Sequence, residues 1–180
     1  MHDFTASDSH CYVFTFKRGA LAALGHDLKL EVGRFTLTLD GPDSHATFDP
    51  ASLRVICAMH EGEERRGTLS DSDRATIDGH VSDDILHPRR YPEIRWRCTA
   101  ITHDGPNAWR LEGQLTLHGE TRPLVARVEQ RDGRLRTRVR LQQSAFGIRP
   151  FRALLGALKI ADEIEVELVV PDRAREHLEP

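Results

Sequence analysis

The chain has 180 residues, a formal net charge of −3, and 39% apolar and 29% charged residues. This is the composition of a soluble globular protein, and the length suits a single domain, residues 1–180, with a sizeable core. The small net charge excludes an overall basic surface for nucleic acid. No apolar run approaches the roughly 18 residues of an integral membrane segment.

Apolar and polar residues alternate along most of the chain, which is typical of strands with one buried face. Turn residues such as Gly33 and Gly133 separate these stretches. In chain order, the apolar positions of the predicted strands are Tyr12, Phe14 and Phe16; His26, Leu28, Leu30 and Val32; Phe35, Leu37 and Leu39; Ala46 and Phe48; Leu53, Val55, Cys57 and Met59; Ile94, Trp96, Cys98 and Ala100; Trp109, Leu111, Leu115 and Leu117; Leu124, Ala126 and Val128; Leu135, Val139 and Leu141; and Ile164, Val166, Leu168 and Val170.

Two segments break this alternation and predict short helices. Over residues 72–86, Ile77, Val81 and Ile85 recur at helical spacing, with Ser and Asp caps in front and Pro88 behind. Over residues 150–158, a proline at the first helical position precedes an apolar stripe made of Phe151, Leu154, Leu155 and Leu158.

Strands with one apolar face each must bury that face, and a sheet that closes on itself does so while removing its edges. We therefore expect an all-β chain folded as an antiparallel barrel, with the two short helices at its ends or mouth. A two-sheet sandwich is the alternative.

Charged residues also alternate in two of the predicted strands. Arg134, Arg136, Arg138 and Arg140 share the face opposite to the apolar one, and so do Glu163, Glu165 and Glu167. Because sequential strands are usually neighbours, we expect an antiparallel ladder of opposite charges on the exterior, with Arg140 near Glu163 and Arg136 near Glu167.

Several motifs, in order, make the chain similar to the YceI-like family of lipocalin-like β-barrels. They are "LGHDLKLEVGRF" (residues 24–35), "YPEIRW" (91–96), "WRLEGQLTLHGETRPL" (109–124), "SAFGI" (144–148) and "IADEIEVELVV" (160–170). The resemblance implies a barrel with an apolar lumen that holds a polyisoprenoid chain such as a quinone tail. Family members are often secreted and often dimeric, so a homodimer is among the implied partners. The chain departs from the family before "FG", where Gln143, Ser144 and Ala145 replace an Arg and an acidic residue.

The cysteines and the N-terminus bear on the compartment. Cys11, Cys57 and Cys98 are scattered and have no metal-ligand spacing, which favours reduced thiols and a cytoplasmic location without disulfides. Residues 1–10 lack the pattern of a secretion signal.

Motifs for chemistry are sparse. His26 and Asp27 are adjacent in a strand, so their side chains diverge; His26 is either a headgroup contact at the barrel mouth or a structural histidine. His80 and His87 lie too far apart along the predicted helix for one metal ion. We find no nucleophile elbow, phosphate loop or dinucleotide motif. The sequence therefore predicts no catalytic set, no metal and no cofactor.

The leading hypothesis is non-catalytic binding of an amphipathic lipid, with a polyisoprenoid or quinone tail, in the barrel lumen. A filled barrel that serves as a structural or protein-interaction module is the alternative, and an enzyme acting on a lipid or small acid is least supported. The candidate ligand-binding residues are Phe14, Phe16, His26, Leu28, Phe35, Leu37, Val55, Trp96, Leu111, Leu115, Val139, Phe146 and Val166.

Overall fold

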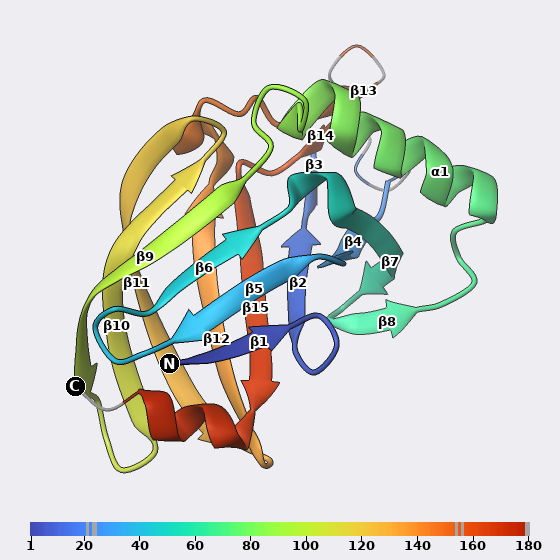
Figure 1. The fold of residues 1–180 in the computed structure, drawn as a ribbon. Coiled ribbons are helices and arrows are strands. Elements are labelled where there is room, and N and C mark those ends of the chain that lie inside the picture. Colours follow the sequence, from blue (N-terminus) through green and yellow to red (C-terminus); the bar gives the residue numbers. More distant parts are fainter. Residues whose placement is uncertain (21, 23–24, 154, 156, 179–180) are drawn as a thin grey trace.

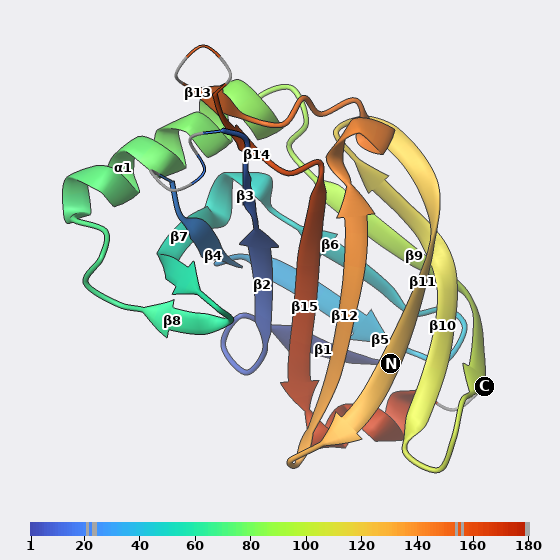
Figure 2. The same cartoon turned by 180° about the vertical axis from the view of Figure 1, so that it is seen from behind.

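A computed structural model describes residues 1–20, 22, 25–153, 155 and 157–178. Most of the chain forms one curled antiparallel sheet that wraps around an apolar interior as a half-barrel (Figures 1 and 2). In sheet order, its strands are β1 (His2–Thr5), β5 (Phe35–Leu39), β6 (His45–Phe48), β9 (Ile94–His103), β10 (Ala108–Leu117), β11 (Glu120–Arg131), β12 (Arg134–Gln142), β15 (Glu163–Pro171), β2 (His10–Thr15), β4 (Asp27–Val32), β7 (Leu53–His60) and β8 (Glu63–Arg65).

Two tight hairpins set the register of the longest strands. His118 and Gly119 join β10 to β11, and Asp132 and Gly133 join β11 to β12, all four with positive φ. Two-residue turns with positive φ at both positions match the twist of the strands they connect. The hairpin predicted at Gly133 is confirmed.

Two chain connections join the opposite ends of the sheet. The β4–β5 connection runs through residues 33–34 and the β6–β7 connection through residues 49–52, which includes a short helical turn, Pro50–Ser52. We call these two segments the seam. The Gly33 N–H donates to the Ser52 carbonyl (3.1 Å), the Asp49 N–H donates to the Arg34 carbonyl (3.0 Å), and the Arg34 guanidinium pairs with the Asp49 carboxylate at 2.6 Å. Contacts between the two connections of the seam thus bring the ends of the sheet together. Among the described residues, β1 and β8 are the two edge strands of the sheet.

The first predicted helix is confirmed. Helix α1 (Asp71–His80) begins at a capping box between Ser70 and Asp73 and continues as a wider π-helical segment, Val81–Leu86. Ile77, Val81 and Leu86 pack against the interior of the sheet. The helix covers one end of the half-barrel (Figure 1).

The second predicted helix is wrong. Its segment contains β13 (Arg152–Ala153) and β14 (Leu158–Ile160), which form a three-stranded sheet with β3 (Lys17–Arg18); Leu154 lies outside the described residues. Leu158 and Ile160 alternate with Lys159, and β3 offers a strand edge to pair with. That distant partner outweighs the local helical spacing. Short 3₁₀ turns occur instead at Gln143–Phe146 and Asp172–His177.

The predicted charge ladder is present on the outer face, in a shifted register. β12 and β15 are antiparallel neighbours, with Arg138 opposite Glu167 and Arg140 opposite Glu165. Glu165 lies 3.2 Å from both Arg138 and Arg140, whereas the expected pairs Arg140–Glu163 and Arg136–Glu167 are longer, at 3.8 and 3.9 Å. Glu165 is therefore the centre of the ladder.

Replacing Glu165 by lysine is expected to lower the melting temperature. The change removes two ion pairs and places a cation opposite Arg140, at a cost of about 1–2 kcal/mol, or roughly 3–6 °C for a chain of this size. Thermal unfolding measures it. Glu163→Lys serves as the control, because Glu163 is half exposed and makes only the 3.8 Å contact; an equal drop in both variants would contradict the central role of Glu165.

Candidate ligand-binding site

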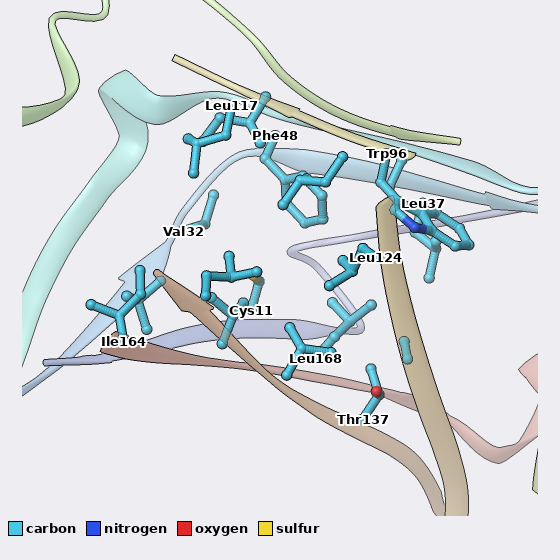
Figure 3. Close-up of a pocket in the computed structure, with 18 of the residues that line it drawn as sticks. Cys11, Val32, Leu37, Phe48, Trp96, Leu117, Leu124, Thr137, Ile164 and Leu168 are labelled. Carbon is cyan, nitrogen blue, oxygen red and sulfur yellow. The ribbon is translucent and has the colours of Figure 1, made fainter. Parts of the chain in front are cut away.

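The curled sheet encloses an apolar cavity of about 220 Å³. Strands from both sides of the half-barrel contribute to its wall, and their side chains converge on it in Figure 3. The lining side chains from the strands are Cys11, Val13, Val32, Leu37, Leu39, Ala46, Phe48, Leu53, Ile94, Trp96, Leu111, Leu115, Leu117, Leu124, Ala126, Val128, Leu135, Thr137, Val139, Leu141, Ile164, Val166, Leu168 and Val170. Pro50, Leu86, Ile148 and Leu178 complete the apolar lining from turns and helix ends.

Four polar residues also line the cavity, and three of them have partners within the protein. The Arg136 guanidinium lies 3.9 Å from Glu167. Gln143 donates to the Ala161 carbonyl (2.9 Å), and Asp49 accepts from Ala51 and Arg34. Among the described residues, the Thr137 hydroxyl and the Trp96 indole N–H are buried without a hydrogen-bond partner. Apolar cavities of about 150 Å³ stay dry and admit apolar molecules, so a cavity of this size and lining favours an apolar occupant over water.

Six of the predicted ligand-binding residues line this cavity together: Leu37, Trp96, Leu111, Leu115, Val139 and Val166. Leu28, Phe35 and Val55 belong instead to a cluster beside it, packed around Leu30, Cys11 and Ala58. Phe146 is buried in the larger core cluster, outside the cavity wall. Phe16 is half-buried after β2, and His26 is exposed in the segment before β4.

Phe14 points outward, opposite to the prediction. The Arg138 guanidinium lies 4.8 Å from its ring centroid, and the Lys29 ammonium lies 3.8 Å from that of the neighbouring Tyr12. These cations cover the rings on the outer face, which is why Phe14 is buried there. The cavity receives Cys11 and Val13 from β2 instead.

Bulges reverse the alternation in two strands. In β7 the register shifts between Cys57, opposite Lys29, and Val55, opposite Leu30, so Cys57 lies on the face of Lys29 while Val55 and Ala58 face the interior. In β9 a shift after Cys98 turns Ile101 inward in place of Ala100. Cys57 and Cys98 therefore do not share the inward face that the sequence suggested. All three cysteines are free and buried, and burial, with Glu31 nearby, raises the pKa of the Cys11 thiol to about 12.

Gly113 makes room for the indole of Trp96. A Cβ atom at Gly113 would lie 2.7 Å from Trp96 Nε1 and against the Arg97 carbonyl. The absence of a side chain lets the indole lie directly against β10, and Trp96 forms part of the cavity wall. The packing of β9 on β10 and the shape of the cavity thus depend on the same glycine.

A pair of histidines joins the end of the helical segment to the β10–β11 hairpin. His87 Nδ1 lies 3.3 Å from His118 Nε2, and the Tyr91 ring packs against His118 in a tilted arrangement, with 4.1 Å between centroids. Burial and His87, with a smaller contribution from Arg90, lower the pKa of His118 despite its hydrogen bond to the backbone of Phe146. Among the described residues, no cluster of three or more His, Cys, Asp or Glu side chains is arranged to hold a metal ion.

Stability is expected to fall at acidic pH through His118. A lowered pKa means that the folded state binds a proton at His118 less readily than the unfolded state does. The contribution of neutral His118 to the free energy of unfolding is therefore fully present above the ordinary pKa of 6.5. It is lost as the pH falls through the folded-state pKa. Melting temperatures of the wild type and His118→Gln, measured between about pH 7.5 and about pH 5, test this. The wild type should lose more than the variant; parallel curves would contradict the assignment.

Comparisons with known proteins agree with this architecture. A model of the YceI-like domain matches residues 10–171. The chain belongs to the YceI-like family. A UPF0312 protein of Vibrio cholerae is 29% identical over 138 residues, which is 69% of each chain, and a UPF0312 protein of Pseudomonas savastanoi is 38% identical over 55 residues, 30% of this chain and 29% of its own.

Solved structures share the fold at low sequence identity. BcnA of Burkholderia cenocepacia superposes with a TM-score of 0.65 over 92% of this chain and 96% of its own, at 15% identity. The YceI protein of Campylobacter jejuni gives 0.56 over 78% and 81%, also at 15% identity. The lipocalin-like fold of this family is consistent with binding a hydrophobic ligand. Within the described residues, no helix combines the length and apolarity needed to span a bilayer.

Proposed function

We propose that this YceI-like protein binds an amphipathic lipid, without catalysis, and holds its polyisoprenoid or quinone tail in the cavity. The observation that carries the proposal is the cavity itself: about 220 Å³ with an almost wholly apolar wall. The proposed ligand contacts are the six predicted residues that line it, Leu37, Trp96, Leu111, Leu115, Val139 and Val166.

Burial of the tail supplies the binding free energy. Each Å² of apolar ligand surface removed from water contributes about 25 cal/mol, less the cost of ordering the chain. An isoprenoid tail has no hydrogen-bonding groups, which suits a wall that is almost wholly apolar and whose Gln143 and Asp49 side chains are engaged by the protein. A ligand with a charged group at depth would lose its hydration without compensation.

Native mass spectrometry of the purified protein tests the proposal. We expect a retained lipid mass, or, after delipidation, uptake of geranylgeraniol in preference to a straight-chain alcohol of equal carbon number. A bare polypeptide mass together with no uptake of either probe would sink the proposal and favour the interaction-module alternative. We also propose that the protein forms a homodimer, and the same spectra test this through the mass of the intact assembly.

We also propose that the protein functions in the cytoplasm. The support is three free and buried cysteines, which a reducing compartment maintains. Thiol titration of the protein, denatured after extraction without reductant, should find all three; two missing thiols would contradict this location.

A further inference from the structure

The small sheet of β3, β13 and β14 carries three cations in one row. Arg152 is directly opposite Lys159, and Lys159 is directly opposite Arg18. Residues opposite each other across strands share a face, and all three side chains are exposed. The row spans about 10 Å across the three strands. Like charges in directly opposed positions destabilise a sheet, so this arrangement costs stability in the free protein.

Within the described part of the chain, none of these three cations has an ion pair or a side-chain hydrogen bond, unlike the arginines of β12. Nearby acidic groups have other partners: Asp27 accepts from the Lys17 N–H (2.7 Å), and Asp162 accepts from Ser144. Asp84 pairs with His80 (2.6 Å), whose ring contacts Phe151 beside β13. The row is therefore a local positive surface of unpaired side chains in a protein whose net charge is −3, next to a helical segment that carries Asp83 and Asp84.

A fully exposed leucine accompanies the row. Leu155 lies in the connection between β13 and β14, with φ of 55° and its side chain in solvent. The opposite face of the small sheet is packed on the protein: Leu158 lies against Gly25, and the Lys17 ammonium donates to the Gly25 carbonyl (3.1 Å). The sheet thus has one face bound to the protein, one cationic face, and an apolar tip.

The small sheet projects from the same end of the molecule as the helix, away from the 3₁₀ turn at Asp172–His177 (Figures 1 and 2). Two strands of the small sheet are adjacent in the chain to strands that line the cavity. β3 follows β2, which contributes Val13, and β14 leads into β15, which contributes Ile164.

We propose that the surface formed by Arg18, Arg152, Lys159 and Leu155 docks on an anionic lipid bilayer. Three unpaired cations complement a layer of negative headgroups, and an exposed leucine gains by entering the boundary of the acyl chains. A nucleic acid would match the cations and leave the leucine in water, so the combination favours a bilayer. This surface is separate from the cavity, and the proposal holds whether or not the cavity is occupied.

Co-sedimentation with vesicles tests the proposal on the whole chain. Wild type should bind vesicles of phosphatidylcholine with about 30% phosphatidylglycerol, fail to bind pure phosphatidylcholine, and release as salt rises from about 0.1 to about 0.5 M. The triple variant Arg18→Gln, Arg152→Gln and Lys159→Gln should bind on the order of a hundredfold more weakly. It should melt no lower than wild type, because it removes like-charge repulsion. Leu155→Asp should weaken binding by about tenfold.

The matched control removes three cations from the ion-paired row on β12, through Arg136→Gln, Arg138→Gln and Arg140→Gln. It changes net charge equally and should keep wild-type binding, with folding checked by circular dichroism. An equal loss of vesicle binding in both triple variants would mean that binding depends only on the net charge of the protein, which would overturn the proposal. Wild type that ignores anionic vesicles, or that binds a single-stranded oligonucleotide more tightly than the vesicles, would overturn it as well.

Discussion

Replacing Ala126 by tryptophan abolishes uptake of geranylgeraniol while the protein stays folded: this is the largest effect we expect at the cavity. Ala126 is buried on β11 opposite Leu111, and both line the cavity. An indole there projects into the space that a lipid tail would occupy. The cavity accommodates much of the added volume, so the cost of overpacking should stay within about 1–3 kcal/mol. Uptake is measured by native mass spectrometry and folding by thermal unfolding.

The neighbouring residue provides the control for that variant. Val125 is 44% exposed and points away from the cavity, so Val125→Trp should leave uptake unchanged. A graded series at Ala126, through valine and leucine to tryptophan, should lower uptake with side-chain size. Normal uptake by a folded Ala126→Trp protein would exclude this cavity as the lipid site.

Adding a single methyl group at Gly113 is expected to destabilise the fold strongly. The new Cβ would meet the Arg97 carbonyl and the indole of Trp96, and a backbone carbonyl in a paired strand has little freedom to move. We expect Gly113→Ala to cost about 3 kcal/mol or more, and the melting temperature to fall by roughly 10 °C. Thermal and urea unfolding measure this.

The same substitution at Gly79 is the matched control. Gly79 lies in α1 with nothing within 4 Å of an added Cβ, so Gly79→Ala should be neutral or stabilising by up to about 1 kcal/mol. If the free energy of unfolding falls in Gly113→Ala and rises in Gly79→Ala, the loss at Gly113 is due to close packing around the added Cβ atom. A Gly113→Ala protein as stable as wild type would mean that β9 and β10 separate more easily than their contacts indicate.

The sequence predicts correctly which residues of a strand face the interior wherever the strand has one clearly apolar face. In β12 and β15, apolar residues alternate with arginine or glutamate, and Val139 and Val166 accordingly line the cavity. The prediction was wrong for β2, where both alternating sets of residues are largely apolar: Cys11 and Val13 on one face, and the larger Tyr12 and Phe14 on the other. The larger side chains lie outside because Lys29 and Arg138, distant in sequence, cover them.

Three other features depend on partners that a linear pattern does not reveal. The bulges in β7 and β9 are set by pairing with β4 and β10, and no turn residue marks them. The segment after Pro150 forms strands because β3, more than a hundred residues earlier, pairs with β14. The alternation of residues identifies side chains of the cavity wall. The volume of the cavity cannot be read from it, because that volume depends on how closely the two sides of the sheet approach each other.

The seam implies that the half-barrel does not resist opening equally on all sides. Most neighbouring strands are joined by backbone ladders, although β11 and β12 pair only between Val128–Arg131 and Arg134–Thr137. At residues 33–34 and 49–52 a few hydrogen bonds and one exposed ion pair hold the two ends of the sheet together. Local separation at the seam breaks few interactions, so the amides of Gly33 and Asp49 should exchange with deuterium sooner than the paired amides of β10. Phe48, Asp49 and Pro50 lie at the seam and on the cavity wall. Local opening at the seam is therefore a fluctuation of low free-energy cost that uncovers the interior.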